Sequence, residues 1–320
     1  MRALKDLSQA ASLDELYPML HARSIMPGWH KPRASLYPEP HKNFRPMHWS
    51  WREGKDALDA AGRLISTEQA HRRNLLLYNP ADEDGYAALR TLVAAYQMIL
   101  PGETAPSHRH SGNALRVILE GEGAYTVVEG ERFDMHPNDV LLTPDWHWHG
   151  HGCDAAASGP CYWLDGLDTP LVHLLEPMFL ETMAGLQPGA PPPPRSPYIF
   201  TWEATQAALD QAPPDPEGHF GRRIELGSPA MVTTALYMQR HDSGTRTPPR
   251  RTTSNQFFCV IEGRGTTTVD GERFAWARGD VLAVPMWRPF EHEFASDATL
   301  FSMTDEPVMR AFNWLRTRNA

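Results

Sequence analysis

The sequence lacks long apolar runs, an excess of positive charge and a set of paired cysteines, and each absence excludes a class of protein. No apolar run is long enough to cross a bilayer, so we expect no membrane association. The formal net charge of −9 would repel a phosphate backbone, and we therefore expect no nucleic acid partner.

Cysteine is scarce, and its spacing indicates neither a zinc ribbon nor a disulfide framework. Only Cys153, Cys161 and Cys259 are present, and no two of them form a CxxC pair. Cys153 and Cys161 are close enough in sequence to form one disulfide, but reduced thiols in a cytoplasmic protein are the favoured interpretation. The N-terminal segment agrees with that location, because acidic residues interrupt the apolar core that a signal peptide needs.

Helical patterns are confined to the N-terminal part of the chain. Residues 12–15 fit a capping box, and residues 54–80 carry apolar side chains at helical spacing. From about Thr91 the pattern changes to short runs rich in Val, Ile, Leu and Tyr, which Gly, Pro and Asp interrupt. Together with 29 prolines and 23 glycines, these runs predict an antiparallel sandwich or barrel. The run "QPGAPPPPRSPY" predicts an exposed, stiff linker.

The β-rich pattern occurs twice in the chain. "LEGEGAYTVVEGERF" (residues 119–133) matches "IEGRGTTTVDGERF" (residues 261–274), with one residue fewer in the second copy. The alignment extends outward to Gly102 with Gly244, Asp139 with Asp280, Pro144 with Pro285 and Trp146 with Trp287. Copies this far apart predict two β domains, because a solenoid needs shorter periods.

Histidines gather in the first copy. His108 and His110 alternate, so on a strand both rings face the same side of a sheet. The run "TPDWHWHGHG" adds His147, His149 and His151, and strand alternation does not choose among these three. Three neutral imidazoles from two strands would form a divalent transition-metal site with open positions. A hydrogen-bonded or surface role is the usual alternative for one histidine, but it is weak for five in two clusters.

Two spacings in this copy carry a resemblance to a known family. Gly102, five further residues, His-x-His and Gly121 are similar to the first cupin motif, and Pro144 with His149 is similar to the second. The chain resembles the bicupin gentisate/salicylate 1,2-dioxygenases in "AHRRNLLLYNP", "LLTPDWHWHGHG", "WLDGLDTPLV" and "DATLFSMTDEPVMRAFNWLR". The resemblance implies a mainly β protein with two cupin domains (jelly-roll β-barrels) and a helical N-terminal arm.

The expected domain boundaries follow the composition and the repeat. Residues 1–85 are the helical arm, and residues 86–180 are the first cupin domain with the metal site. Residues 181–215 are the proline-rich linker, and residues 216–320 are a metal-free second cupin domain. The resemblance also implies a homo-oligomer, such as a tetramer, with the arm as an interface element.

The resemblance assigns the metal ligands. Cupin spacing selects His149, so His108, His110 and His149 are implied to hold Fe(II). Many cupins add a glutamate ligand shortly after His-x-His, but this sequence has Ala114 there. The ion then keeps its double positive charge and has positions for the substrate and O2. His147 is expected to be a strand-edge or wall residue.

The resemblance also implies roles for residues around the metal. His151 is expected to serve as an acid/base or as a hydrogen-bond donor to the substrate. Arg116 is expected to pair with the substrate carboxylate, and a salt bridge to a core acid is the alternative. Gln97 is expected to hydrogen-bond the carboxylate or bound oxygen, with a satisfied strand glutamine as the rival interpretation. Of Arg72 and Arg73, Arg72 is favoured to reach the pocket.

Asp165 has two interpretations. It is implied to orient His151 and raise its basicity, as a carboxylate does behind a catalytic histidine. It is equally suited to cap a turn before Gly166. Trp146 and Trp148 are expected to be core or pocket-wall aromatics.

The second copy is expected to bind no metal. In the repeat register His108, His110 and His149 correspond to Arg250, Thr252 and Phe290, and only His292 remains, opposite His151.

The implied function is an Fe(II)-dependent dioxygenase that uses O2 to cleave the ring of a small aromatic 2-hydroxy acid. Cleavage falls between the carboxyl-bearing and hydroxyl-bearing carbons of a 2-hydroxybenzoate. Gentisate and a substituted salicylate such as 5-nitrosalicylate both stay open as substrates, because Val93 and Ala95 occupy positions where relatives often differ. The alternatives are a 1-hydroxy-2-naphthoate dioxygenase, another metal-dependent bicupin enzyme, or a non-catalytic bicupin that binds a ligand.

Overall fold

The computed structural model describes residues 6–70, 72–227 and 231–319. The chain forms two compact units, residues 1–41 and residues 42–320. The first unit contains a short 3-10 helix, η1 (Leu7–Gln9), and helix α1 (Leu13–His21). The Ser12 side chain accepts a hydrogen bond from the Glu15 N–H at 3.3 Å, so α1 begins at the predicted capping box.

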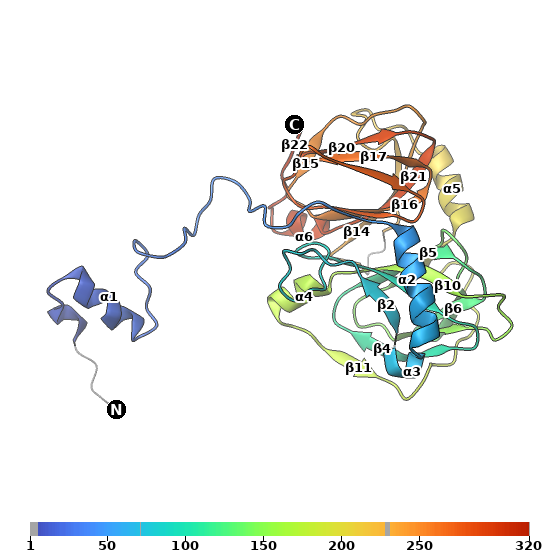
Figure 1. Ribbon diagram of the computed structural model, residues 1–320, viewed down its shortest axis with the longest axis horizontal. Helices are drawn as coiled ribbons and strands as arrows, with labels where there is room; N and C mark the ends of the chain where they lie inside the picture. The colour runs from blue at the N-terminus through green and yellow to red at the C-terminus, as the bar shows by residue number, and fades with distance from the viewer. Residues whose placement is uncertain (1–5, 71, 228–230, 320) are drawn as a thin grey trace. The chain divides into compact units, whose positions relative to one another are not determined.

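The second unit consists mainly of two β-barrels, each made of a six-stranded and a five-stranded antiparallel sheet (Figure 1). The first barrel contains β2 (Arg73–Leu76), β3 (Val93–Ile99), β4 (Thr104–His110), β5 (Ala114–Glu120), β6 (Ala124–Val128), β7 (Glu131–Asp134), β8 (Val140–Thr143), β9 (His149–Cys153), β10 (Cys161–Leu167), β11 (Leu180–Thr182) and β12 (Ile199–Phe200). Its sheets run β12-β8-β5-β10-β3-β2 and β11-β4-β9-β6-β7. The mainly β, two-barrel architecture predicted from the sequence is therefore confirmed.

The second barrel repeats this arrangement. It contains β1 (Met47–Trp49), β13 (Arg222–Glu225), β14 (Ala235–His241), β15 (Arg250–Thr252), β16 (Gln256–Glu262), β17 (Arg264–Val269), β18 (Glu272–Ala277), β19 (Val281–Val284), β20 (Phe290–Phe294), β21 (Ala298–Thr304) and β22 (Thr317–Asn319). Its sheets run β1-β19-β16-β21-β14-β13 and β18-β17-β20-β15-β22.

Short helices accompany the barrels, and one predicted helix is shorter than expected. The helices are α2 (Trp51–Leu64), α3 (Thr67–Ala70), α4 (Thr169–Leu175), α5 (Trp202–Gln211) and α6 (Glu306–Ala311). The helical pattern over residues 54–80 breaks after α3, and residues 73–76 form β2 instead. Pairing with β3 overrides the local pattern there, because it supplies partners for backbone groups and covers the barrel edge. Helix α5 lies within residues 181–215, for which the sequence predicted a linker.

The six-stranded sheets of both barrels contribute to one large apolar core. Tyr96 and Leu115 of the first barrel belong to the same buried cluster as Phe257 and Phe301 of the second. Each barrel also has its own interior cluster. Burial of this apolar surface is the main favourable term that joins the two barrels. Among the described residues, no helix is both long and apolar enough to cross a membrane.

Each barrel includes an edge strand that comes from the segment preceding the other barrel in the sequence. Strand β1, before the first barrel, pairs with β19 of the second, and β12, before the second barrel, pairs with β8 of the first. The following helices repeat the exchange. The Trp51 N–H donates to Asp280 at 2.8 Å, and the Trp202 N–H donates to Asp139 at 2.7 Å. The aspartates that matched in the sequence repeat therefore have the same structural role.

A second exchange uses two buried aspartates. Asp305 accepts hydrogen bonds from Thr91 Oγ1 at 2.6 Å and from Asn255 Nδ2 at 2.9 Å. Asp168 of the first barrel has the equivalent arrangement with Thr233, which precedes β14. In each case a threonine just before β3 or β14 of one barrel binds an aspartate just after β21 or β10 of the other. These contacts make the duplication a closed, reciprocal pair of barrels.

Candidate metal centre and substrate site

Strand pairing in the first barrel brings three histidines together. Strand β4 carries His108 and His110, strand β9 carries His149, and His108 lies directly opposite His149 in the ladder. The possible ligand atoms of the three rings lie within 4.8 Å of one another. Among the described residues, no other group of three His, Cys, Asp or Glu side chains meets this condition. The site is therefore defined by two adjacent antiparallel strands.

The hydrogen bonds of His110 and His149 leave the Nε2 atoms of these two rings free for a ligand. His149 Nδ1 lies 2.9 Å from the His147 carbonyl, and His110 Nδ1 lies 3.2 Å from the Ser111 carbonyl. A carbonyl only accepts, so each Nδ1 carries the proton and each Nε2 keeps its lone pair. Burial lowers the pKa of all three rings, and burial together with Arg72 lowers that of His108 to about 3.

Three neutral imidazoles without a carboxylate fit a divalent transition metal with open coordination positions. Ala114 lies buried on β5, opposite Thr143, and it offers no ligand atom. The donor set therefore adds no negative charge to the ion.

The other two histidines of the run "TPDWHWHGHG" lie in different surroundings. His147 is half-buried, and its Nδ1 lies 2.8 Å from the Asp145 carbonyl, outside the cluster. His151 is 1% exposed and lies two residues beyond His149 on β9, with ring centroids 6.2 Å apart. Strand alternation places both rings of β9 on the barrel interior.

His151 is held by a residue that the sequence analysis missed. Thr126 Oγ1 donates to the Gly150 carbonyl at 3.0 Å and lies 3.0 Å from His151 Nδ1. The hydroxyl must therefore accept from Nδ1–H, which leaves His151 Nε2 as a free lone pair. Burial, and then Arg116, lower the pKa of this ring well below its usual value. The repeat carried the signal, because the equivalent Thr267 Oγ1 lies 2.7 Å from His292 Nδ1.

Arg116 enters the site from β5, in the sheet that faces the histidines. Its side chain is 5% exposed, and its Nε and Nη1 atoms have no hydrogen-bond partner among the described residues. Its ion-pair partner is Asp165, with Nε and Oδ1 3.5 Å apart. Burial lowers the pKa of Arg116 to about 10, although Asp165 opposes that shift. A buried guanidinium with unsatisfied N–H groups favours a further anion.

The structure places Asp165 differently from both interpretations of the sequence. It lies within β10, directly opposite Arg116 in the ladder, so it caps no turn. Its Oδ1 accepts from Trp163 Nε1 at 3.0 Å, and among the described residues it makes no hydrogen bond with His151. Burial raises its pKa to about 6 against the opposing charges of Arg116 and Arg72. Asp165 faces the arginines because β10 lies between β3 and β5, whereas His151 is in the opposite sheet.

Adjacent Arg72 and Arg73 point to different places. Arg72 Nη2 lies 2.7 Å from His108 Nδ1 and 3.0 Å from His108 Nε2, so its guanidinium borders the histidine cluster. Arg73 instead donates to the Ile65 carbonyl at 2.8 Å and forms a buried ion pair with Glu103 at 2.5 Å. Arg72 is thus at the site, and Arg73 joins β2 to neighbouring segments.

Strand β3 supplies one wall of the site. Gln97 is 4% exposed and lies opposite Trp163, and among the described residues its side chain has no hydrogen-bond partner. Val93 and Ala95 share its face, and Ala95 lies opposite Asp165. Trp163 is fully buried, with its ring centroid 5.7 Å from that of His151. The aromatic ring closes the wall beside the polar groups.

The second barrel has no equivalent centre among its described residues. Arg250 lies opposite Phe290, as His108 lies opposite His149, so the structure confirms the predicted register. The turn before β20 agrees, because Trp287 has a φ of 58° where Trp146 has 62°. No ligand set survives at these positions.

Comparison with known proteins agrees with this geometry. Residues 95–166 and 237–304 each match the family model described as the cupin domain. The chain is 34% identical to gentisate 1,2 dioxygenase 1 of Aquipseudomonas alcaligenes, over 95% of this chain and 96% of that one. It is 35% identical to 5-aminosalicylate 1,2-dioxygenase of Comamonas sp., over 95% and 89% of the respective chains.

A solved structure is similarly close. The salicylate 1,2-dioxygenase of Pseudoaminobacter salicylatoxidans, solved as an adduct with gentisate, superposes with a TM-score of 0.87 at 30% identity. The match covers 100% of this chain and 96% of that one. The chain therefore belongs to the gentisate/salicylate 1,2-dioxygenase family of ring-cleaving bicupin enzymes.

Proposed function

We propose that this enzyme uses Fe(II) and O2 to cleave a 2-hydroxybenzoate between its carboxyl-bearing and hydroxyl-bearing carbons. Gentisate or a substituted salicylate such as 5-nitrosalicylate is the substrate. The proposal rests on a buried cluster of three histidines that two arginines, Arg72 and Arg116, border. Asp165 is the one carboxylate whose charge acts on both arginines, so a positive charge remains for an anionic substrate. The names of relatives support the substrate class, since they include gentisate, 5-aminosalicylate and 5-nitrosalicylic acid 1,2-dioxygenases.

His108, His110 and His149 would hold the iron, and the free Nε2 atoms of His110 and His149 would be two of its ligand atoms. When bound, Fe(II) supplies an electrophilic centre for the carboxylate and phenolate and a path for electrons from the ring to O2.

The charge at the site favours an anionic substrate. Arg116 and Arg72 both act on Asp165, which carries at most one negative charge. The unpartnered Nη1 of Arg116 is therefore available to the substrate carboxylate, and Asp165 keeps the guanidinium in place. Arg72 reaches the same region from the side of His108. Two donors from different strands fix the ring orientation, which is the positioning that a ring-opening reaction needs.

Two neutral groups complete the site. His151 Nε2 has a free lone pair, so it accepts the proton of the 2-hydroxyl group and can return it later. The Gln97 amide donates to the substrate carboxylate or to oxygen. The Trp163 ring excludes water beside His151, which strengthens these hydrogen bonds.

Anaerobic reconstitution with Fe(II), followed by oxygen uptake measurements, tests this proposal. Gentisate, salicylate, 5-nitrosalicylate and 1-hydroxy-2-naphthoate are the probes, and we expect equimolar O2 uptake with at least one 2-hydroxybenzoate. Turnover of the naphthoate alone would favour the alternative, which is also the activity of a 32% identical relative from Nocardioides sp.. No uptake with any of the four would contradict the proposal.

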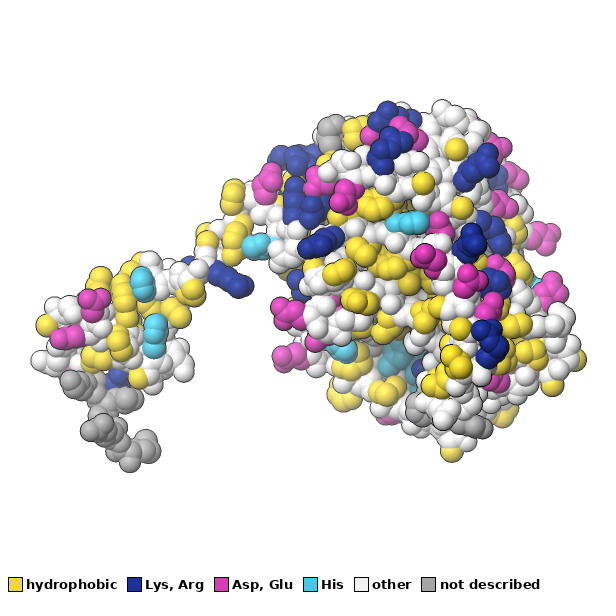
Figure 2. Space-filling model, in the orientation of Figure 1, with side chains coloured by type: hydrophobic (Ala, Val, Ile, Leu, Met, Phe, Trp, Pro, Cys, Tyr) yellow, Lys and Arg dark blue, Asp and Glu magenta, His cyan; other side chains and the backbone are white. Residues whose placement is uncertain are grey.

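We further propose a cytoplasmic homo-oligomer, such as a tetramer, in which a second copy covers the N-terminal unit. Large apolar side chains are exposed on that unit, as the yellow atoms around α1 show (Figure 2). Trp29 is 72% exposed and Leu36 is 87% exposed, which is costly for a free surface. The three buried, free thiols support the cytoplasmic location. Sedimentation of the full chain and of a chain that begins at Lys42 would test the interface.

A further inference from the structure

The second barrel has a polar interior where the first barrel holds its histidines. A cavity of about 20 Å³ lies there. Its lining includes Arg223, Arg250, Tyr237, Gln239, His292 and Ser302. Arg250 occupies the position of His108 in the repeat, and Gln239 lies on β14 as Gln97 lies on β3. The duplicated site has therefore kept its polar character although the metal ligands are gone.

Two arginines converge on this cavity, and among the described residues no carboxylate forms an ion pair with either of them. The guanidinium carbons of Arg223 and Arg250 lie 3.5 Å and 4.5 Å from the centroid of the same Phe220 ring. Neither guanidinium forms an ion pair or hydrogen bond with another described residue, and Arg250 Nε is fully buried. Stacking on an aromatic face stabilises a guanidinium but leaves its in-plane N–H groups free. Two adjacent cations of this kind repel each other unless an anion lies between them.

Glu306 and Asp215 act on the charges of both guanidinium groups, but neither carboxylate forms an ion pair with them. Glu306 lines the cavity, but it accepts from Arg310 Nε at 2.9 Å on the same helix, α6. The cavity also contains a second unsatisfied polar atom. His292 is 1% exposed, Thr267 holds its Nδ1, and its Nε2 has no partner. Because Trp276 Nε1 donates to Thr267 Oγ1 at 2.9 Å, the Thr267 hydroxyl can donate to His292 Nδ1, which leaves Nε2–H as an unpaired donor that suits an anion.

We propose that the second barrel binds one small anion between Arg223 and Arg250. The ligand is a monatomic anion or the smallest of carboxylates, because the cavity has little more room than one water molecule needs. A halide and the carboxylate of formate share the required charge and size. The duplication thus produced a cation site in one barrel and an anion site in the other.

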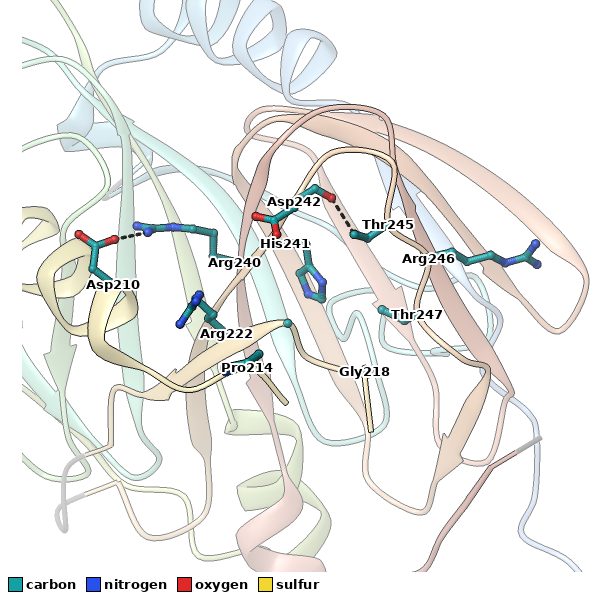
Figure 3. A pocket seen from close by; sticks show the side chains of 11 residues that line it. Asp210, Pro214, Gly218, Arg222, Arg240, His241, Asp242, Thr245, Arg246 and Thr247 are labelled. Carbon is teal, nitrogen blue, oxygen red and sulfur yellow. Dashed lines mark hydrogen bonds and ion pairs between the residues drawn. The ribbon is translucent and has the colours of Figure 1, made fainter. Parts of the chain in front are cut away.

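A larger cavity of the same barrel provides the contrast. It measures about 720 Å³ and lies at the other end of β14, lined by Arg222, Arg240 and Arg246 (Figure 3). There the arginines have partners, since Arg240 pairs with Asp210 and Arg246 pairs with Glu291. Positive side chains alone therefore do not define the proposed site.

Crystals of the full chain soaked in sodium bromide test the site directly. We expect an anomalous bromide peak in contact with both Arg223 and Arg250, and we expect Arg250→Gln to remove it. A peak that survives in Arg250→Gln, or peaks confined to exposed arginines such as Arg246, would overturn the proposal.

Thermal unfolding provides the solution test, with chloride or formate replacing gluconate at constant ionic strength. We expect chloride or formate to raise the Tm of the wild type and of the matched control Arg246→Gln. The affinity should fall about tenfold or more in Arg250→Gln, because one charged partner is lost. The response to chloride against that to formate distinguishes a halide from a carboxylate ligand.

A second variant guards against an unstable Arg250→Gln. If Glu306 competes with the anion, Glu306→Gln should bind chloride or formate more tightly than the wild type does. If chloride or formate raises the Tm of Glu306→Gln but not that of the wild type, Glu306 is the counterion of the two arginines, and the proposal fails. Iron content and ring-cleavage turnover, measured in parallel, separate this failure from a failure of the proposed function.

Discussion

The two barrels share one scaffold but present opposite surroundings to a ligand. Strands β4 and β9 of the first barrel place three neutral imidazoles around one point, whereas β15 and β20 of the second place Arg250 and Phe290 there. The supporting polar contacts survive in both. His151 rests on Thr126, and His292 rests on Thr267. The comparison shows that the repeat keeps the strand pairing and the threonine–histidine contact in both barrels. A few side chains on these strands then determine whether a cation or an anion binds.

The largest expected effect comes from removing a ligand in the first barrel. His149→Ala leaves only two imidazole ligands. Loss of a hydrogen-bond partner behind a metal ligand lowers metal affinity roughly 10- to 100-fold, and we expect loss of the ligand itself to lower the iron affinity further. His147→Ala should keep its iron, because His147 lies outside the cluster. Metal analysis after dialysis measures both. Equal loss of iron in the two variants would mean that the ligand set is misassigned.

The histidine that follows the ligand in each barrel sharpens the comparison. His151→Ala should lower kcat about 10²- to 10⁴-fold while iron is retained, since a positioned acid/base contributes that much. His292→Ala, the matched change in the second barrel, should leave kcat unaltered. Steady-state oxygen uptake with iron content as a control measures the effect. A similar fall in both variants would indicate a structural role instead.

The reciprocal aspartates predict a pH effect on stability. Burial raises the pKa of Asp305 to about 6, from 3.8. The folded chain therefore binds this proton more tightly, so the associated stabilisation is present below about pH 4 and is lost as pH rises through about 6. Relative to Asp305→Asn, the wild type should lose about 3 kcal/mol of unfolding free energy over that range. Urea unfolding at several pH values checks this, and a difference that does not vary with pH would refute it.

The smallest expected effect separates two adjacent arginines. Arg72→Gln should raise KM about 10- to 100-fold, because one charged hydrogen bond to the substrate carboxylate is lost. Arg73→Gln should lower the Tm with little change in KM, because Arg73 pairs with Glu103 away from the site. Kinetics and thermal unfolding of both variants distinguish these roles. A larger change in KM for Arg73→Gln would reverse the assignment.

The clustering of the three histidines could be predicted from the sequence because its signals are local or repeated. Spacing brought out His108 and His110, and the repeat separated the two barrels. Contacts between segments that are distant in the sequence could not be predicted from such patterns. Neither the pairing of Asp165 with Arg116 across β5 and β10 nor the meeting of Arg223 and Arg250 over Phe220 leaves a periodic pattern. The strand at residues 73–76 was missed because pairing with β3, rather than local propensity, decides its conformation.

The central claim is that one barrel binds iron and the other does not, and iron content per chain tests it most directly. After anaerobic loading and removal of free metal, we expect about one iron per chain in the wild type and in His292→Ala, and none in His149→Ala. Two irons per wild-type chain, or one iron retained in His149→Ala, would contradict the account.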